Sequence, residues 1–147
     1  MNKKWLLRTR CTAPFDARSF SQLSDEACEE FLTIRDNTTE SLEQLAEKLR
    51  KWAKQQGSEF EVQVENRLLK RKEALKKAME SVSALQARDD VKEALREILK
   101  AANNYTLSAQ EQWQHKDLVI QGLSKRTQRR VYDEIFRMCP FLCTYLI

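Results

Sequence analysis

The sequence is poor in the residues that interrupt regular secondary structure. Its 147 residues include only 2 glycines and 2 prolines. A protein with many strands needs many turns, and turns depend on glycine, proline, asparagine and aspartate. The shortage disfavours β-rich folds and predicts a small number of long helices.

The sequence also lacks the usual residue patterns of enzymes. His115 is its only histidine, and no Ser-His-Asp set, glycine-rich phosphate loop or pair of acids stands out. We therefore expect a protein that is not an enzyme and that has no cofactor, no metal site and no small-molecule substrate.

No apolar run approaches the roughly 18 residues of a membrane span. The first ten residues offer only Trp5-Leu6-Leu7 as an apolar run, which is too short for a secretory signal. The first 18 residues hold five Lys or Arg and a single Asp, which leaves a transit peptide as the alternative. The four cysteines, Cys11, Cys28, Cys139 and Cys143, show no disulfide framework. We expect them to be small core residues in a reducing compartment, with the cytoplasm as the location and no membrane partner.

Several segments carry a helix start signal followed by apolar residues at helical spacing. Ser24 is a candidate cap, and four capping-box patterns pair Ser41 with Gln44, Ser58 with Glu61, Asp90 with Glu93 and Ser108 with Glu111. A last helix is predicted from near Ser124 toward Pro140. Residues 36–41 and 103–107 are the expected breaks.

These signals predict an all-α bundle of five or six helices in a single domain over residues 1–147. Its expected parts are a short extended arm at 1–22, a helical hairpin region at 24–87 and C-terminal helices at 90–147. A long antiparallel hairpin of about 41–87 would turn at Gly57, so that residues whose numbers sum to about 115 face each other. Leu68, Leu75 and Val82 recur one heptad apart, as in a coiled coil.

The charges are unevenly distributed along a chain whose net charge is +4. Residues 67–77 read RLLKRKEALKK, and from them we select Lys70, Arg71, Lys76 and Lys77 as candidate phosphate contacts. The alternative is structural: residues 19–66 hold eleven acids and five bases, and acids of the helix at 41–56 would partly neutralise this basic stretch across the hairpin, with Glu43 near Lys72.

The second basic stretch, residues 125–137, supplies the candidate phosphate contacts Lys125, Arg126, Arg129 and Arg130. Arg130 has an acidic partner at i,i+4 in Glu134, and Asp133 is assigned to Arg137, so we expect the other three bases to lack a partner, although Asp133 also lies four residues after Arg129. They also lie in the first turn, where the helix macrodipole disfavours bases and favours a bound anion.

A helix-turn-helix would explain the same stretch as a reader of DNA sequence. Asp117, Gln121 and Gln128 fall where such a motif needs apolar residues, so a face that binds the nucleic-acid backbone is the preferred interpretation. Aromatic residues among the bases, which would indicate stacking of single strands, are sparse, with Tyr132 and Trp5 the candidates.

The C-terminal stretch 138–147 carries no side-chain charge. It docks either into the bundle or onto another chain, and Phe141, Leu142, Tyr145 and Leu146 are the candidate partner-binding residues.

No motif is specific enough to assign a family. We expect a non-catalytic helical subunit or regulator that binds a nucleic-acid backbone, DNA or RNA, with little sequence specificity. Other protein subunits or further copies of the chain are expected partners in a larger assembly. The alternative is a protein-binding adaptor or inhibitor that uses its helical faces and apolar C-terminal segment, its bases being structural. An enzyme accessory or a toxin–antitoxin component is a third class.

Overall fold

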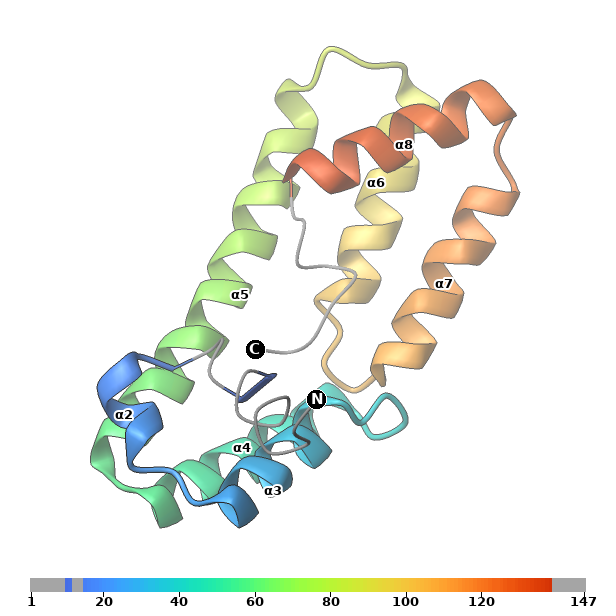
Figure 1. Cartoon of the computed structure of the whole chain (residues 1–147). Coiled ribbons are helices and arrows are strands. Elements are labelled where there is room, and N and C mark those ends of the chain that lie inside the picture. The colour runs from blue at the N-terminus through green and yellow to red at the C-terminus, as the bar shows by residue number, and fades with distance from the viewer. Residues whose placement is uncertain (1–9, 12–14, 139–147) are drawn as a thin grey trace, which may run out of the picture. The chain divides into compact units, whose positions relative to one another are not determined.

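The chain is all-α, as the sequence predicts, in a computed structural model that describes residues 10–11 and 15–138 (Figure 1). The helices are α2 (Ala17–Ser21), α3 (Asp25–Arg35), α4 (Leu42–Gln56), α5 (Ser58–Ala84), α6 (Asp89–Ala102), α7 (Ala109–Gln121) and α8 (Lys125–Met138). Helix α2 falls within the predicted extended arm, whose residues 1–9 and 12–14 lie outside the described part.

Three of the expected helix boundaries have the predicted chemistry. The Ser24 hydroxyl accepts the N–H of Ala27 at the start of α3. Ser108 and Glu111 form a complete capping box, because each backbone N–H donates to the side chain of the other residue. Gly57 separates α4 from α5 with a φ of 130°, a left-handed conformation that favours glycine.

The third capping box was predicted wrongly. Helix α6 already begins at Asp89, so Asp90 lies inside its first turn and Arg88 occupies the cap position without a side-chain bond. The Asp90 carboxylate instead accepts a hydrogen bond from the hydroxyl of Thr127, 37 residues away. Asp90, which matched a local helix-start pattern, thus makes a tertiary contact with α8.

The described residues form two compact units. The first comprises residues 10–11, 15–37 and 43–70, and the second comprises 38–42 and 71–138. The organisation as one domain stays a prediction.

The first unit is built around aromatic side chains. The Trp52 ring lies 5.1 Å from that of Phe31 and 5.7 Å from that of Phe60, and Phe15 contacts all three. The indole N–H of Trp52 donates to the Ala27 carbonyl at 2.9 Å, so the polar atom of this buried ring is satisfied.

The hairpin register in the first unit agrees with the prediction. Arg50 of α4 forms an ion pair with Glu65 of α5, and their numbers sum to 115 as the predicted register requires. The charges of the pair are nevertheless the reverse of the prediction, because α4 supplies the base and α5 supplies the acid.

The first unit also contains a disulfide that the cysteine spacing did not predict. Cys11 and Cys28 are both buried and are joined across 17 positions, with their Cα atoms 5.8 Å apart. Residues 10–11 pack near α3, where the Arg10 carbonyl accepts a hydrogen bond from Arg35 at 3.0 Å. The prediction of buried cysteines is thus confirmed for this pair, whereas Cys139 and Cys143 lie outside the described residues.

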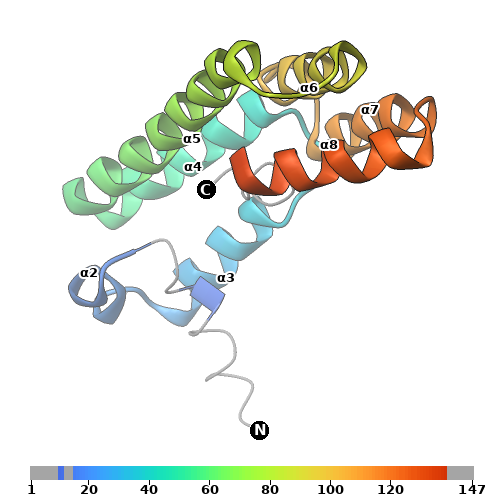
Figure 2. The same cartoon turned by 90° about the horizontal axis from the view of Figure 1, so that it is seen from above.

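The second unit packs α6, α7 and α8 with the later turns of α5. Helices α6 and α7 run side by side in opposite directions, and α8 crosses them at one end (Figures 1 and 2). Its core combines side chains from all four helices: Leu75, Ala78, Val82, Val91, Ala94, Leu95, Ile98, Leu99, Ala102, Ile120, Val131 and Ile135.

Candidate nucleic-acid interface

The first turn of α8 is capped by a side chain and is hydrogen-bonded to α6. The Ser124 hydroxyl accepts the N–H of Thr127 at 3.3 Å, and the two hydroxyls lie 2.9 Å apart. Because Thr127 also donates to Asp90 of α6, the first turn of α8 is fastened to α6. Val131 and Ile135 continue this buried face, so the opposite face points to solvent.

A charged cluster lies at the edge of the buried face. The side chain of Glu134 is only 1% exposed, and its Oε1 lies 3.0 Å from Arg130 and 3.4 Å from Arg137. The guanidinium of Arg130 also donates to the Gln86 carbonyl at 3.3 Å. The predicted pair of Arg130 with Glu134 is confirmed, whereas Arg137 pairs with Glu134 and not with the predicted Asp133.

Lys125, Arg126 and Arg129 differ from Arg130 in their surroundings. All three are exposed. Within the described part of the chain, none of them forms a hydrogen bond, ion pair or ring contact. Their positive charges are therefore directed to solvent, and the expected absence of a partner holds among the described residues, even for Arg129, which has Asp133 four residues later.

Two aromatic side chains share the exposed face of α8. Tyr132 is 49% exposed and Phe136 is 78% exposed. Tyr132 was a predicted candidate, whereas Phe136 was not. The signal was present in the spacing, because Lys125, Arg129, Tyr132 and Phe136 follow one another at intervals of four, three and four residues and thus share one helical face.

The bases predicted on α5 divide into three groups. In the first unit, Lys70 is exposed and borders a shallow hollow of about 320 Å³. In the second unit, Lys76 and Lys77 are exposed, whereas Arg71 donates to the Ala102 carbonyl at 3.3 Å and to the Tyr105 hydroxyl at 2.9 Å.

Arg71 is thus held by internal contacts, but not by the acids expected across the hairpin. Its guanidinium carbon lies 5.1 Å from the centre of the Tyr105 ring, and the Lys72 ammonium lies 5.4 Å from the same centre. A carbonyl, a hydroxyl and an aromatic face therefore contact the Arg71 guanidinium, and the same aromatic face contacts the exposed Lys72.

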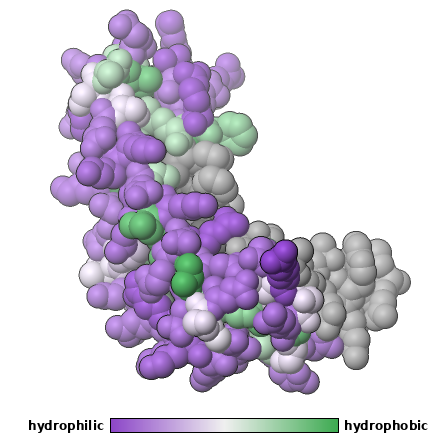
Figure 3. Space-filling view, turned by 90° about the vertical axis from the view of Figure 1, so that its left-hand side faces the viewer, coloured by the Kyte–Doolittle hydropathy of each residue, from purple (hydrophilic) through white to green (hydrophobic). Residues whose placement is uncertain are grey.

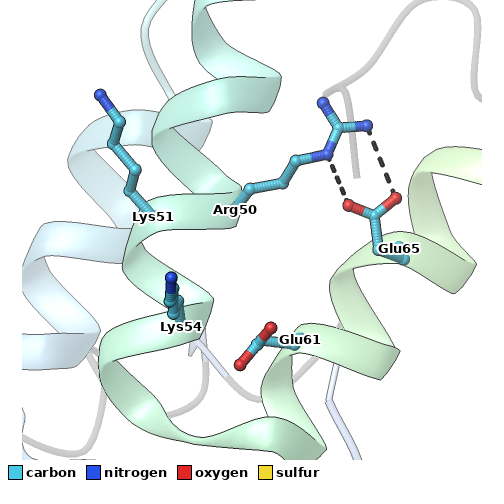
Figure 4. A pocket seen from close by; sticks show the side chains of 5 residues that line it. All are labelled: Arg50, Lys51, Lys54, Glu61 and Glu65. Carbon is cyan, nitrogen blue, oxygen red and sulfur yellow. Dashed lines mark hydrogen bonds and ion pairs between the residues drawn. The ribbon is translucent and has the colours of Figure 1, made fainter.

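A further surface pocket, of about 240 Å³, lies between α4 and α5 in the first unit. Arg50, Lys51, Lys54, Glu61 and Glu65 line it (Figure 4). Arg50 points at Glu65 across the pocket, so two carboxylates offset its three bases and make it a poor site for a polyanion.

The surface visible in Figure 3 is mostly hydrophilic, with a few separate hydrophobic groups. None of the helices in the described ranges is long and apolar enough to cross a membrane. Within the same ranges, no three His, Cys, Asp or Glu side chains gather in an arrangement that could hold a metal ion. Phe141, Leu142, Tyr145 and Leu146, the predicted partner-binding residues, lie outside the described residues.

Comparisons of the chain with protein-family models, with curated proteins and with solved structures found no match.

Proposed function

We propose that the protein is a non-catalytic helical subunit or regulator that binds a nucleic-acid backbone with little sequence specificity. The observation that carries the proposal is the exposure of Lys125, Arg126 and Arg129 on one short stretch of α8, with no partner among the described residues. Unpaired bases on a firmly packed helix suit a polyanion such as a chain of phosphates.

The packing of α8 supports this role. The helix is fastened to the second unit by the Thr127–Asp90 bond and by the buried side chains of Val131 and Ile135, so the bases project from a fixed support. Phosphate contacts of this kind carry no sequence information, which accounts for the low specificity in the proposal. Lys76 and Lys77 of α5 are candidate additional contacts.

The test is a titration of labelled duplex DNA or RNA at several salt concentrations. Three phosphate contacts predict that log K falls against log salt with a slope of about −2.7 on a duplex. Lys125→Ala/Arg129→Ala removes two of these contacts, so the slope should become shallower, at about −0.9, and the affinity at low salt should decrease.

The matched control is Lys51→Ala/Lys54→Ala, which removes two exposed bases from α4 and the same total charge. It should leave binding nearly unchanged. Equal losses in both double variants would show that net charge alone causes binding and would refute the role of α8. Lys76→Ala/Lys77→Ala tests the α5 bases separately.

A protein-binding adaptor is the second candidate, and the exposure of large apolar side chains on helical faces favours it. Leu118 of α7 is 69% exposed, in addition to Phe136 of α8. Light scattering on the intact chain and on a chain truncated after Arg137 tests this function. Self-association in the intact chain only, without nucleic-acid binding, would favour the adaptor. In either case the proposed location is the cytoplasm, although the Cys11–Cys28 disulfide is a bond that reducing compartments disfavour.

A further inference from the structure

We infer that the exposed face of α8 binds a single strand of nucleic acid, with Lys125 and Arg129 on its phosphates and Tyr132 and Phe136 stacked on its bases. This inference rests on the proposed function and specifies its ligand as an unpaired strand. It is based on one observation: basic side chains with no partner among the described residues lie beside exposed aromatic rings on one face of the helix.

The four side chains form a continuous stripe. At about 100° per residue, positions 125, 129, 132 and 136 fall within roughly 60° of one another around the helix axis. The buried residues Thr127, Val131 and Ile135 lie on the other side. Along the axis the stripe extends about 16 Å, with its basic side chains toward the N-terminal end and its aromatic side chains toward the C-terminal end.

The charges around the stripe favour an anion. Arg126 flanks it as a third exposed base, and Asp133 is the one exposed acid on α8. The other acid of this helix, Glu134, is buried under Arg130 and Arg137 and does not reach this face. Three bases against one acid make the stripe complementary to phosphates.

The aromatic rings explain why the ligand should be unpaired. A duplex hides the faces of its bases, whereas the faces of unpaired bases are free to stack on aromatic side chains. Tyr132 and Phe136 lie about 6 Å apart along the axis, which exceeds the roughly 3.4 Å step between stacked nucleotides. The two rings therefore suit two bases that are splayed apart, one on each ring.

This arrangement reverses the preference that charge alone would give. For the same number of neutralised phosphates, counterion release favours a duplex over a single strand, with slopes of about −0.9 and −0.7 per contact. A protein that binds only the backbone should thus prefer duplex. Tighter binding of the single strand requires an additional contact with the bases.

The experiment measures fluorescence anisotropy of labelled oligo(U), oligo(dT) and a duplex, each about 12 nucleotides long, which is within the usual site size for such surfaces. The intact chain should bind at least one of the single strands more tightly than the duplex. Phe136→Ala should lower single-strand affinity by about 5- to 100-fold and leave duplex affinity unchanged.

Two further variants separate stacking from general effects. Leu118→Ala removes a similarly exposed apolar side chain from α7 and should leave all affinities unchanged. Phe136→Trp should keep single-strand affinity, and the fluorescence of the new indole should be quenched when a strand binds. Because Phe136 is exposed, neither substitution at this position should alter the helical circular dichroism.

The outcomes distinguish the inference from the proposed function. Tighter binding of duplex than of either single strand, with no effect of Phe136→Ala, would overturn the inference and leave backbone binding intact. Single-strand and duplex binding that both survive Lys125→Ala/Arg129→Ala would overturn the role of α8 in both. A self-association that Phe136→Ala abolishes, without binding of any oligonucleotide, would assign the stripe to a protein contact and overturn both.

Discussion

Arg129 and Arg130 are neighbours in sequence, and the structure predicts that removing the first affects binding and removing the second affects stability. Arg129 is exposed and has no partner among the described residues. Arg130 is 43% exposed, and its guanidinium lies 3.0 Å from the buried carboxylate of Glu134. We therefore expect Arg129→Ala to weaken nucleic-acid binding without affecting stability, and Arg130→Ala to destabilise the fold.

The magnitude for Arg130 follows from what its removal leaves behind. Breaking a buried ion pair typically costs about 3–5 kcal/mol, because the remaining charge is uncompensated. Here Arg137 remains 3.4 Å from the same oxygen of Glu134, and Arg130 itself is partly solvated. We therefore expect a loss of about 2 kcal/mol in the free energy of unfolding, or about 4–8 °C in Tm for a chain of this size.

The assay is urea unfolding followed by circular dichroism at the helical band, with the two single variants measured side by side. Arg129→Ala should lie within about 0.5 kcal/mol of the unchanged chain, as is usual for a surface substitution. Glu134→Gln provides the cycle: in its background, Arg130→Ala should cost much less, because no buried charge remains. Equal stabilities of Arg129→Ala and Arg130→Ala would refute the division of these bases into external and internal ones.

Three further predictions concern stability. Reduction of the Cys11–Cys28 disulfide, which closes a loop across 17 positions, should lower the free energy of unfolding by about 3 kcal/mol, and Cys11→Ala should show no further loss on reduction. Ser108→Ala should cost about 1 kcal/mol in urea unfolding through loss of the α7 cap, whereas a chain as stable as before would contradict the capping role. The backbone N–H of Ser19 and its side chain lower the pKa of Asp16 below its ordinary value. A lowered folded-state pKa stabilises the fold above pH about 4, and this contribution is lost as the pH falls through the folded pKa. The urea midpoint of Asp16→Asn should therefore decline less than that of the unchanged chain on acidification, and parallel declines would count against this linkage.

Local signals predicted the parts of the fold that depend on local chemistry. The Ser24 cap, the Ser108–Glu111 box and the left-handed Gly57 were all readable, because each involves residues within one helical turn. The turn at Gly57 then set the register that places Arg50 opposite Glu65. Short-range geometry was sufficient in these cases.

Contacts between distant residues could not be predicted in the same way. Arg71 is held by Tyr105, 34 positions later, and no periodicity in either segment indicates that pair. Asp90 matched a capping pattern but bonds to Thr127 in α8. Phe136 was missed for another reason: an apolar residue on an amphipathic helix is expected in the core, although its spacing from Lys125, Arg129 and Tyr132 places it on their exposed face.

Helical periodicity limits how many bases of one cluster can face a ligand. Arg71 and Arg130 turn inward to protein acceptors, whereas Lys70, Lys76, Lys77, Lys125, Arg126 and Arg129 remain exposed. Eight phosphate contacts would give a duplex salt slope of about −7, the six exposed bases about −5, and the three on α8 alone about −3. These values differ enough to be separated in one titration. The measured slope therefore counts the bases that act, and a slope near −7 would require Arg71 and Arg130 to leave their internal partners on binding.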